Sequence, residues 1–253
     1  MLRLILILLA LATPLAAEEK IVLGLSQNRV AITANFDGSE ILIFGAVKRD
    51  QAVKGQAPLQ VIVAVTGPSE QIVVRRKQRV FGIWANKDAV EISGAPSFYA
   101  VAATGPLDEL LSEGFNRLYH VSINNTMQPV NVPEGFTGAN DFTAAVIRIR
   151  EDDGLFIHDI GTVDLSEETL FRTSIALPSN LVEGDYRVRT ILTRDKQVVD
   201  VSETTIAVRK VGLERFIFSL AHERPLVYGL LSLTIAILAG WAASAVFRLL
   251  RLT

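Results

Sequence analysis

The chain has 253 residues, of which 49% are hydrophobic and 21% charged, and its formal net charge is −2. This composition excludes a disordered chain and a strongly basic nucleic-acid-binding domain, so we expect no nucleic-acid partner. With no cysteine, the sequence excludes disulfides, iron–sulfur clusters and thiol catalysis. The three histidines, His120, His158 and His222, lack the spacing of a metal site, so we expect no metal and no other cofactor.

The N-terminus has the three parts of a secretory signal peptide. Arg3 precedes the uncharged, apolar residues 4–12, and small residues then lead to two glutamates. The apolar run is too short to cross a bilayer. We predict a signal peptide over residues 1–17, cleaved after Ala17. An uncleaved signal anchor is the alternative, because Leu15 fits the −3 position poorly; either segment would deliver the following domain across a membrane.

The next part of the chain reads as short strands. Apolar, β-branched runs alternate with turn sequences that contain Gly, Pro and Asn, and this spacing predicts an immunoglobulin-like β-sandwich. The run at residues 61–65 is apolar throughout, which predicts a strand covered on both faces. The expected strands are residues 21–25, 29–33, 40–47, 59–66, 71–75, 80–84 and 98–102.

The middle of the chain changes to a helical pattern. Residues 107–118 and 142–149 carry apolar side chains at helical spacing, so we expect two amphipathic helices, the second capped by Asp141. The loop between them, residues 120–140, contains Pro and Gly and is long enough to carry function, although loops of this length are about as often plain connectors.

Strand patterns return after residue 154, at residues 155–160, 169–177, 185–193 and 197–208. Here Gly184 and Tyr186 open a strand after a proline-bearing loop, as in the tyrosine corner of sandwich domains. The sequence leaves open whether the two strand-rich stretches form one sandwich or two.

The C-terminus carries the clearest membrane signal. Residues 226–247 are 22 residues without a charge and reach about 33 Å as a helix, so we predict a transmembrane helix. The predicted signal peptide makes Arg248 and Arg251 cytoplasmic, although more basic residues precede the span than follow it. Residues 212–225 are amphipathic, and would lie on the membrane surface or extend the transmembrane helix.

The predicted architecture is therefore mainly β, with a small helical insertion and one C-terminal transmembrane helix. In order, we expect a signal peptide (1–17), an N-terminal β-sandwich (18–103), a helical insertion (104–153), a C-terminal β-sandwich region (154–211), a juxtamembrane segment (212–225), the transmembrane helix (226–247) and a short tail (248–253).

Short motifs spread over nearly the whole chain carry a family resemblance. They include Gly24-Leu25-Ser26, Gly82-Ile83-Trp84, Pro96-Ser97-Phe98, Leu170-Phe171-Arg172 and Gly212-Leu213-Glu214-Arg215. With these motifs the chain resembles the Alph_Pro_TM family of single-pass transmembrane proteins of alphaproteobacteria. The resemblance implies a Gram-negative inner-membrane protein that faces the periplasm, and an accessory role beside permeases that resemble sulfite exporters. None of the motifs is a catalytic signature.

The densest basic cluster is the first candidate binding site. Arg75, Lys77 and Arg79 alternate along an expected strand and so share a face, and Trp84 follows closely. Such a cluster can bind anionic lipid headgroups, an anionic ligand or an acidic partner surface. A solvated hairpin is the favoured interpretation.

The transmembrane helix offers the second candidate. Small residues recur every four positions, which would let another membrane helix approach closely, from a partner or from a second copy of the chain. A lone anchor is an equally good interpretation. The stripe consists of Ser232, Ala236, Gly240 and Ser244.

We expect no enzyme. The sequence has no Gly-x-Ser-x-Gly elbow, and the acidic residues 151–153 near His158 are more typical of a solvated turn than of a cation site. The leading hypothesis is a periplasmic binding or adaptor module, anchored in the inner-membrane bilayer and acting as an accessory to another membrane protein, such as a transporter. The alternative is a ligand sensor or enzyme with a site in the 120–140 loop.

Overall fold

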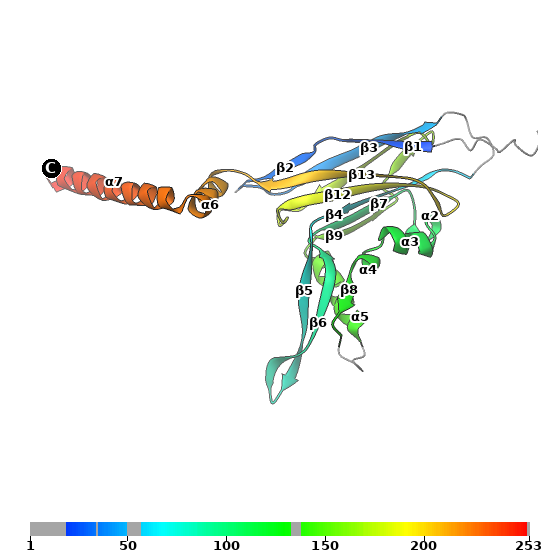
Figure 1. Cartoon of the computed structure of the whole chain (residues 1–253), viewed down its shortest axis with the longest axis horizontal. Coiled ribbons are helices and arrows are strands. Elements are labelled where there is room, and N and C mark those ends of the chain that lie inside the picture. Colours follow the sequence, from blue (N-terminus) through cyan, green and yellow to red (C-terminus); the bar gives the residue numbers. More distant parts are fainter. Residues whose placement is uncertain (1–18, 34, 50–56, 133–137, 252–253) are drawn as a thin grey trace, which may run out of the picture. The chain divides into compact units, whose positions relative to one another are not determined.

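A computed structural model of the chain describes residues 19–33, 35–49, 57–132 and 138–251 (Figure 1). The predicted signal peptide and its cleavage site lie outside the described residues, as do residues 133–137 of the 120–140 loop. Within the described residues the chain divides into two units: residues 19–30 with 37–208, and residues 31–36 with 209–251.

The described residues form three sheets. The four-stranded sheet has the order β1 (Glu19–Leu25), β3 (Ser39–Arg49), β11 (Leu170–Leu177) and β10 (Asp164–Ser166). The six-stranded sheet has the order β2 (Arg29–Ile32), β13 (Gln197–Lys210), β12 (Gly184–Arg194), β4 (Gln60–Thr66), β7 (Tyr99–Ala103) and β9 (Phe156–Ile160). The three-stranded sheet has the order β5 (Ser69–Val80), β6 (Ile83–Pro96) and β8 (Gln128–Val130).

The strands before and after the helical insertion share these sheets. β3 pairs with β11 in an antiparallel register that runs from Ser39 opposite Leu177 to Ala46 opposite Leu170. In the same way β4 pairs with β12, while β7 and β9 pair in parallel. The two strand-rich stretches therefore build one unit, which answers the question that the sequence left open.

Burial patterns show which sheet faces are covered. Along β3, Ile41 and Ile43 are buried while Leu42 and Phe44 are exposed, so only one face of the four-stranded sheet is covered. Along β4 every residue from Val61 to Val65 is buried, as predicted for a strand covered on both faces. The four-stranded sheet lies against one face of the six-stranded sheet, and the insertion packs on the other.

The helical insertion consists of α2 (Leu107–Leu110), α3 (Glu113–Tyr119), α4 (Ile123–Thr126) and α5 (Ala139–Asp152). The expected helix over residues 107–118 is wrong, because it is broken between α2 and α3. Leu111 is extended, with φ −142° and ψ 136°, and the next amide, of Ser112, donates to the carbonyl of Lys196 in the β12–β13 turn. A tertiary contact thus interrupts a continuous helical pattern.

Two further local predictions are wrong. Asp141 is not the cap of α5, because Gly138, with φ 94°, occupies the N-cap position and Asp141 lies in the first helical turn. The expected strand at residues 80–84 is interrupted by a two-residue hairpin turn at Phe81 and Gly82, which both have positive φ, 49° and 89°; β5 ends at Val80 and β6 begins at Ile83.

The tyrosine corner is present. The Tyr186 hydroxyl donates a hydrogen bond to the carbonyl of Val182, 2.8 Å away and four residues upstream. Burial raises the pKa of this phenol above its usual value. The corner fixes the loop that leads into β12.

The second unit carries the membrane signal. α7 (Pro225–Arg251) contains a 21-residue apolar stretch, Pro225–Ala245, that is long enough to cross a bilayer, which confirms the predicted transmembrane helix. The juxtamembrane residues form a separate helix, α6 (Leu213–Glu223), because Arg224 leaves the helical conformation with φ −136° and ψ 64°. α6 is therefore not an upward extension of α7.

Candidate functional site

The β5–β6 hairpin carries the predicted basic cluster. Its base is packed, since Ile72 and Val74 contact the core cluster that contains Ile92 and Phe142. β8 pairs with β6 only at residues 91–93, so the rest of the hairpin towards its turn is a two-stranded ribbon. Figure 1 shows this ribbon leading to a turn away from the two larger sheets. The turn is therefore accessible to solvent.

The structure brings the four predicted basic-site residues together on this ribbon. Arg79 lies directly opposite Trp84, and Arg75 and Lys77 follow at alternate positions of β5. All four are exposed, Trp84 to 70%. The hairpin favoured by the sequence is thus present; whether these residues bind a ligand stays a prediction.

Arg76 differs from its neighbours, as strand alternation predicts. Its guanidinium pairs with the Asp88 carboxylate, 2.6 Å away, and lies 5.4 Å from the centre of the Phe142 ring of α5. Arg76 therefore contacts the insertion while its side chain stays 47% exposed, and its charge is paired with Asp88.

A second surface, which the sequence analysis missed, lies on the uncovered face of the four-stranded sheet. We call it the apolar patch; it consists of Val22, Leu42, Phe44 and Leu170, all more than 40% exposed. Val22 and Leu170 lie on either side of Ala46 in one cross-strand row. The unbroken apolar run Ile41-Leu42-Ile43-Phe44 was the available signal, because a strand with one solvated face normally alternates.

Gly24 shapes this patch. A Cβ at this position would lie 2.6 Å from the Phe44 ring, so the ring covers the glycine on the neighbouring strand. Phe44 thus lies across Gly24 towards β1, and on the β11 side the patch is bordered by Arg172 and Ser174, which lie opposite Phe44 and Leu42.

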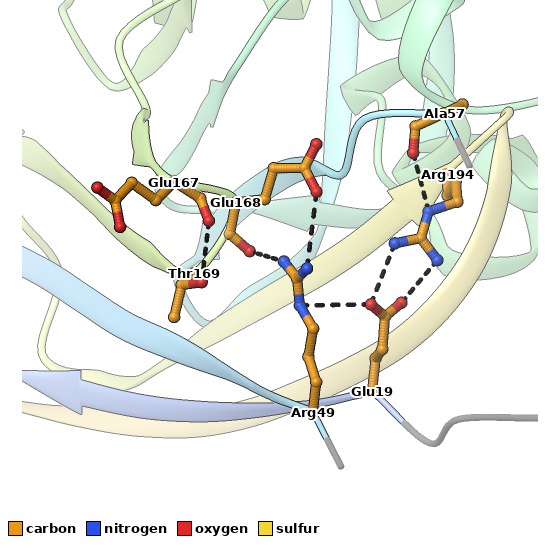
Figure 2. A network of polar contacts seen from close by, with 7 residues as sticks. All are labelled: Glu19, Arg49, Ala57, Glu167, Glu168, Thr169 and Arg194. Atoms are coloured by element: carbon orange, nitrogen blue, oxygen red, sulfur yellow. Dashed lines mark hydrogen bonds and ion pairs between the residues drawn. The ribbon is translucent and has the colours of Figure 1, made fainter. Parts of the chain in front are cut away.

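A buried ionic network fixes the edge of the same sheet (Figure 2). Glu19, the first residue of β1, is 5% exposed, and Arg194 of β12 binds both of its carboxylate oxygens, at 2.7 and 3.0 Å. Arg49 of β3 lies 3.5 Å from the same carboxylate and also donates to the carbonyl of Glu168. Arg194 donates further to the carbonyl of Ala57. The network joins both large sheets, and sequence reasoning missed it because its members lie far apart in the chain.

The alternative site, around residues 120–140, is only partly described. His120 and His158 contact different residues. The His120 ring nitrogen Nδ1 lies 2.6 Å from the carbonyl oxygen of Asn125, while the His158 Nε2 lies 3.4 Å from a Glu151 carboxylate oxygen. Among the described residues, no group of three His, Cys, Asp or Glu side chains could hold a metal ion.

A hollow of about 810 Å³ lies beside α3 and α4, with Asn116, Ser122 and Lys196 in its lining. Asn116 and Ser122 satisfy each other, because the Asn116 amide donates to the Ser122 hydroxyl at 2.8 Å and accepts from the Ser122 amide at 2.9 Å. Neither His120 nor His158 lines this hollow. Asn116 and Ser122 are thus engaged in shaping the loop.

The small-residue stripe of the transmembrane helix lies within α7, as predicted. Ser232, Ala236, Gly240 and Ser244 are all exposed along the helix. The Ser232 hydroxyl donates back to the Gly229 carbonyl at 2.9 Å, so this polar group has a partner within the helix. The stripe's role in helix association stays a prediction.

Comparison with known proteins identifies the family. The family model described as "Putative transmembrane protein (Alph_Pro_TM)" matches residues 20–249. The chain belongs to the Alph_Pro_TM family. The match covers both units, the sheets as well as the apolar helix, and so confirms the resemblance that the motifs indicated. A search of curated proteins gives no match.

The described surfaces of this Alph_Pro_TM protein are of two kinds, apolar and polar. The apolar patch and the hairpin turn expose large apolar side chains, whereas in the hollow beside α3 the Asn116 and Ser122 side chains are hydrogen-bonded to each other. Exposed apolar area of this kind is typical of surfaces that bind another molecule.

Proposed function

We propose that this chain is a membrane-anchored binding module that docks onto another membrane protein and has no catalytic activity. In this proposal the β-rich unit lies in the periplasm, because a signal peptide would translocate it and the short tail with Arg248 and Arg251 would stay in the cytoplasm. The membrane is then the inner membrane of a Gram-negative cell, as the family resemblance implies.

The apolar patch is the observation that supports docking. The outer face of a half-covered sheet is normally polar, yet Val22, Leu42, Phe44 and Leu170 leave large apolar surfaces in water. Burial of this area against a partner would be favourable by about 25 cal/mol per Å² of apolar surface.

The anchor narrows the class of partner. α7 confines the module to a membrane, so a partner in the same membrane meets it at a raised effective concentration, and a modest patch can then sustain a stable complex. A transporter would fit this requirement. An enzyme or sensor is less well supported, because neither His120 nor His158 lines the hollow beside α3, and the Asn116 and Ser122 side chains there are paired with each other.

The test is a mild-detergent pull-down of the tagged, full-length protein from its native membranes. We expect one membrane protein in constant ratio with the wild type. The double variant Val22→Asp/Leu170→Asp should lose it, because two charges replace the apolar row. A version ending at Arg224 reports how far the membrane helix contributes.

The matched control is Val182→Asp/Leu118→Asp. These residues are 52% and 65% exposed, against 56% and 59% for Val22 and Leu170, but lie outside the patch. The control should retain the partner. Retention by the patch variant would contradict the proposal, as would a crosslinked product, through a photoreactive residue at Leu42, that contains only two copies of this chain.

A further inference from the structure

The end of the β5–β6 hairpin combines an apolar turn with unpaired cations, away from the apolar patch. We propose that this hairpin end, residues 75–87, binds the surface of an anionic lipid bilayer. The apolar turn enters the interface and the cations behind it meet the lipid phosphates. The proposal goes beyond partner docking, and concerns a different surface.

The turn presents apolar side chains to water with little polar cover. Val80, Phe81, Ile83 and Trp84 are four of the five residues around it, and Phe81 is fully exposed. Trp and other large apolar side chains favour the region between lipid headgroups and acyl chains. A turn of this composition therefore suits shallow insertion.

The conformation of the turn points the same way. Phe81 has φ 49° and Gly82 φ 89°, the signs required by a two-residue hairpin turn that favours Asn-Gly. A bulky side chain is disfavoured in this left-handed region. Phe81 neither favours the turn conformation nor makes a buried contact, so it does not stabilise the fold. A strained, fully exposed phenylalanine of this kind is better explained by contact with another molecule.

The cations form a collar behind the turn. Arg75, Lys77 and Arg79 spread over about 13 Å of one ribbon face, and Lys87 lies in the bulge of the opposite strand. In the described part of the chain none of these four has an ion pair, whereas Arg76 is neutralised by Asp88. No acidic residue lies between Gln71 and Lys87. The collar is therefore a local positive surface on a chain with a net charge of −2.

Charge and shape together favour lipid over protein. Insertion of the apolar turn by about 5–10 Å would bring the collar to the headgroup level, where each Lys or Arg adds affinity for anionic lipids. The anchor α7 already keeps the chain beside a bilayer, so a weak contact of this kind would be occupied.

The test follows Trp84 in the full-length protein reconstituted into lipid vesicles. The chain has two tryptophans, so Trp241→Phe leaves Trp84 as the only tryptophan. We expect brominated lipids to quench Trp84 in vesicles containing phosphatidylglycerol, more weakly in pure phosphatidylcholine, and less as salt is raised. The converse variant, Trp84→Phe, keeps Trp241 in α7 as the control for insertion.

Two sets of variants separate lipid binding from folding. Phe81→Asn places a favoured residue in the turn, so the unfolding midpoint should stay or rise while quenching of Trp84 falls. Arg75→Gln/Lys77→Gln/Arg79→Gln should lower the ratio of bound to free hairpin end by about fivefold per cation removed. The matched control is Lys48→Gln/Arg117→Gln/Arg148→Gln, three exposed cations elsewhere, which should leave the quenching unchanged.

The proposal is overturned if Trp84 is not quenched in phosphatidylglycerol vesicles, or if quenching is the same in both lipids and insensitive to the collar variants. It is also overturned if a photoreactive residue at Phe81 crosslinks to a protein in native membranes, while vesicles give no quenching. The apolar-patch variant Val22→Asp/Leu170→Asp should quench like the wild type, so failure here and failure of partner docking are distinguishable.

Discussion

At the scale of single residues, Glu19 is a charged side chain whose loss should strongly lower stability. Its buried carboxylate lies between Arg49 and Arg194, and removal would leave two guanidinium groups without their shared anion. We expect Glu19→Ala to lower the free energy of unfolding by about 3 kcal/mol, measured by urea denaturation of the detergent-solubilised protein.

Glu203→Ala is the control for this prediction. Glu203 also bridges two arginines, Arg187 and Arg189, at 3.1 and 3.2 Å, but its side chain is half-exposed. Exposed pairs contribute little, so we expect a loss of less than about 1 kcal/mol. Equal losses from the two variants would contradict a special role for the buried network.

Tyr99 should make the fold sensitive to alkali. Its hydroxyl donates to the carbonyl of Val121, and burial raises the pKa of the phenol well above its usual value. Below about pH 10 the phenol is protonated in both the folded and unfolded states, so the free energy of unfolding does not depend on it. Above this pH only the unfolded state loses the proton, and the free energy of unfolding falls.

Tyr99→Phe should reduce this alkaline decline. At neutral pH the variant should lose about 1 kcal/mol, because the Val121 carbonyl loses its donor. The measurement is the free energy of unfolding at a series of pH values from 7 to 11. A decline equal to that of the wild type would show that other groups cause it.

At the scale of elements, the sequence predicts the helix α7 itself but does not show which other membrane helix it contacts. Length and apolarity alone fix a membrane-spanning helix, because the bilayer core demands both. The stripe of small residues predicts a helix–helix contact, and Gly240→Leu should lower the yield of crosslinked membrane complex without changing insertion.

Ala242→Leu is the matched control, since two residues along a helix place it on nearly the opposite side from Gly240. This control should crosslink like the wild type. Unchanged yields with Gly240→Leu would mean that the stripe is not an interface.

The β5–β6 hairpin shows where element prediction failed. The sequence indicated strands on both sides of residue 80, but the turn at Phe81-Gly82 lacks the usual Asn-Gly signal, so residues 80–84 were expected as strand. Alternation still predicted correctly that Arg76 faces away from Arg75 and Lys77. Local periodicity was thus reliable within a strand and unreliable at the turn.

At the scale of the whole molecule, the six-stranded sheet organises the larger unit. It is covered by the four-stranded sheet on one face and by the helical insertion on the other, so a strand such as β4 is buried throughout. Each large sheet takes strands from both sides of the insertion, so the segments 18–103 and 154–211 depend on each other. Neither segment buries its apolar face alone.

The sequence by itself determined the features that depend on local pattern. Mainly β structure, the tyrosine corner at Tyr186, the helical insertion and the transmembrane helix all follow from periodicity, turn residues or length, which neighbouring residues define. The family followed from motifs that are also local.

Only the tertiary structure decided which side chains meet and which stay uncovered. Glu19 and Arg194 are separated by 175 residues and become partners through strand pairing alone. Leu42 and Ile43 are adjacent apolar residues on one strand, yet Leu42 is exposed and Ile43 is buried, because the six-stranded sheet covers only one face of the four-stranded sheet. Strand order and coverage arise from long-range packing, and no window of sequence contains that information.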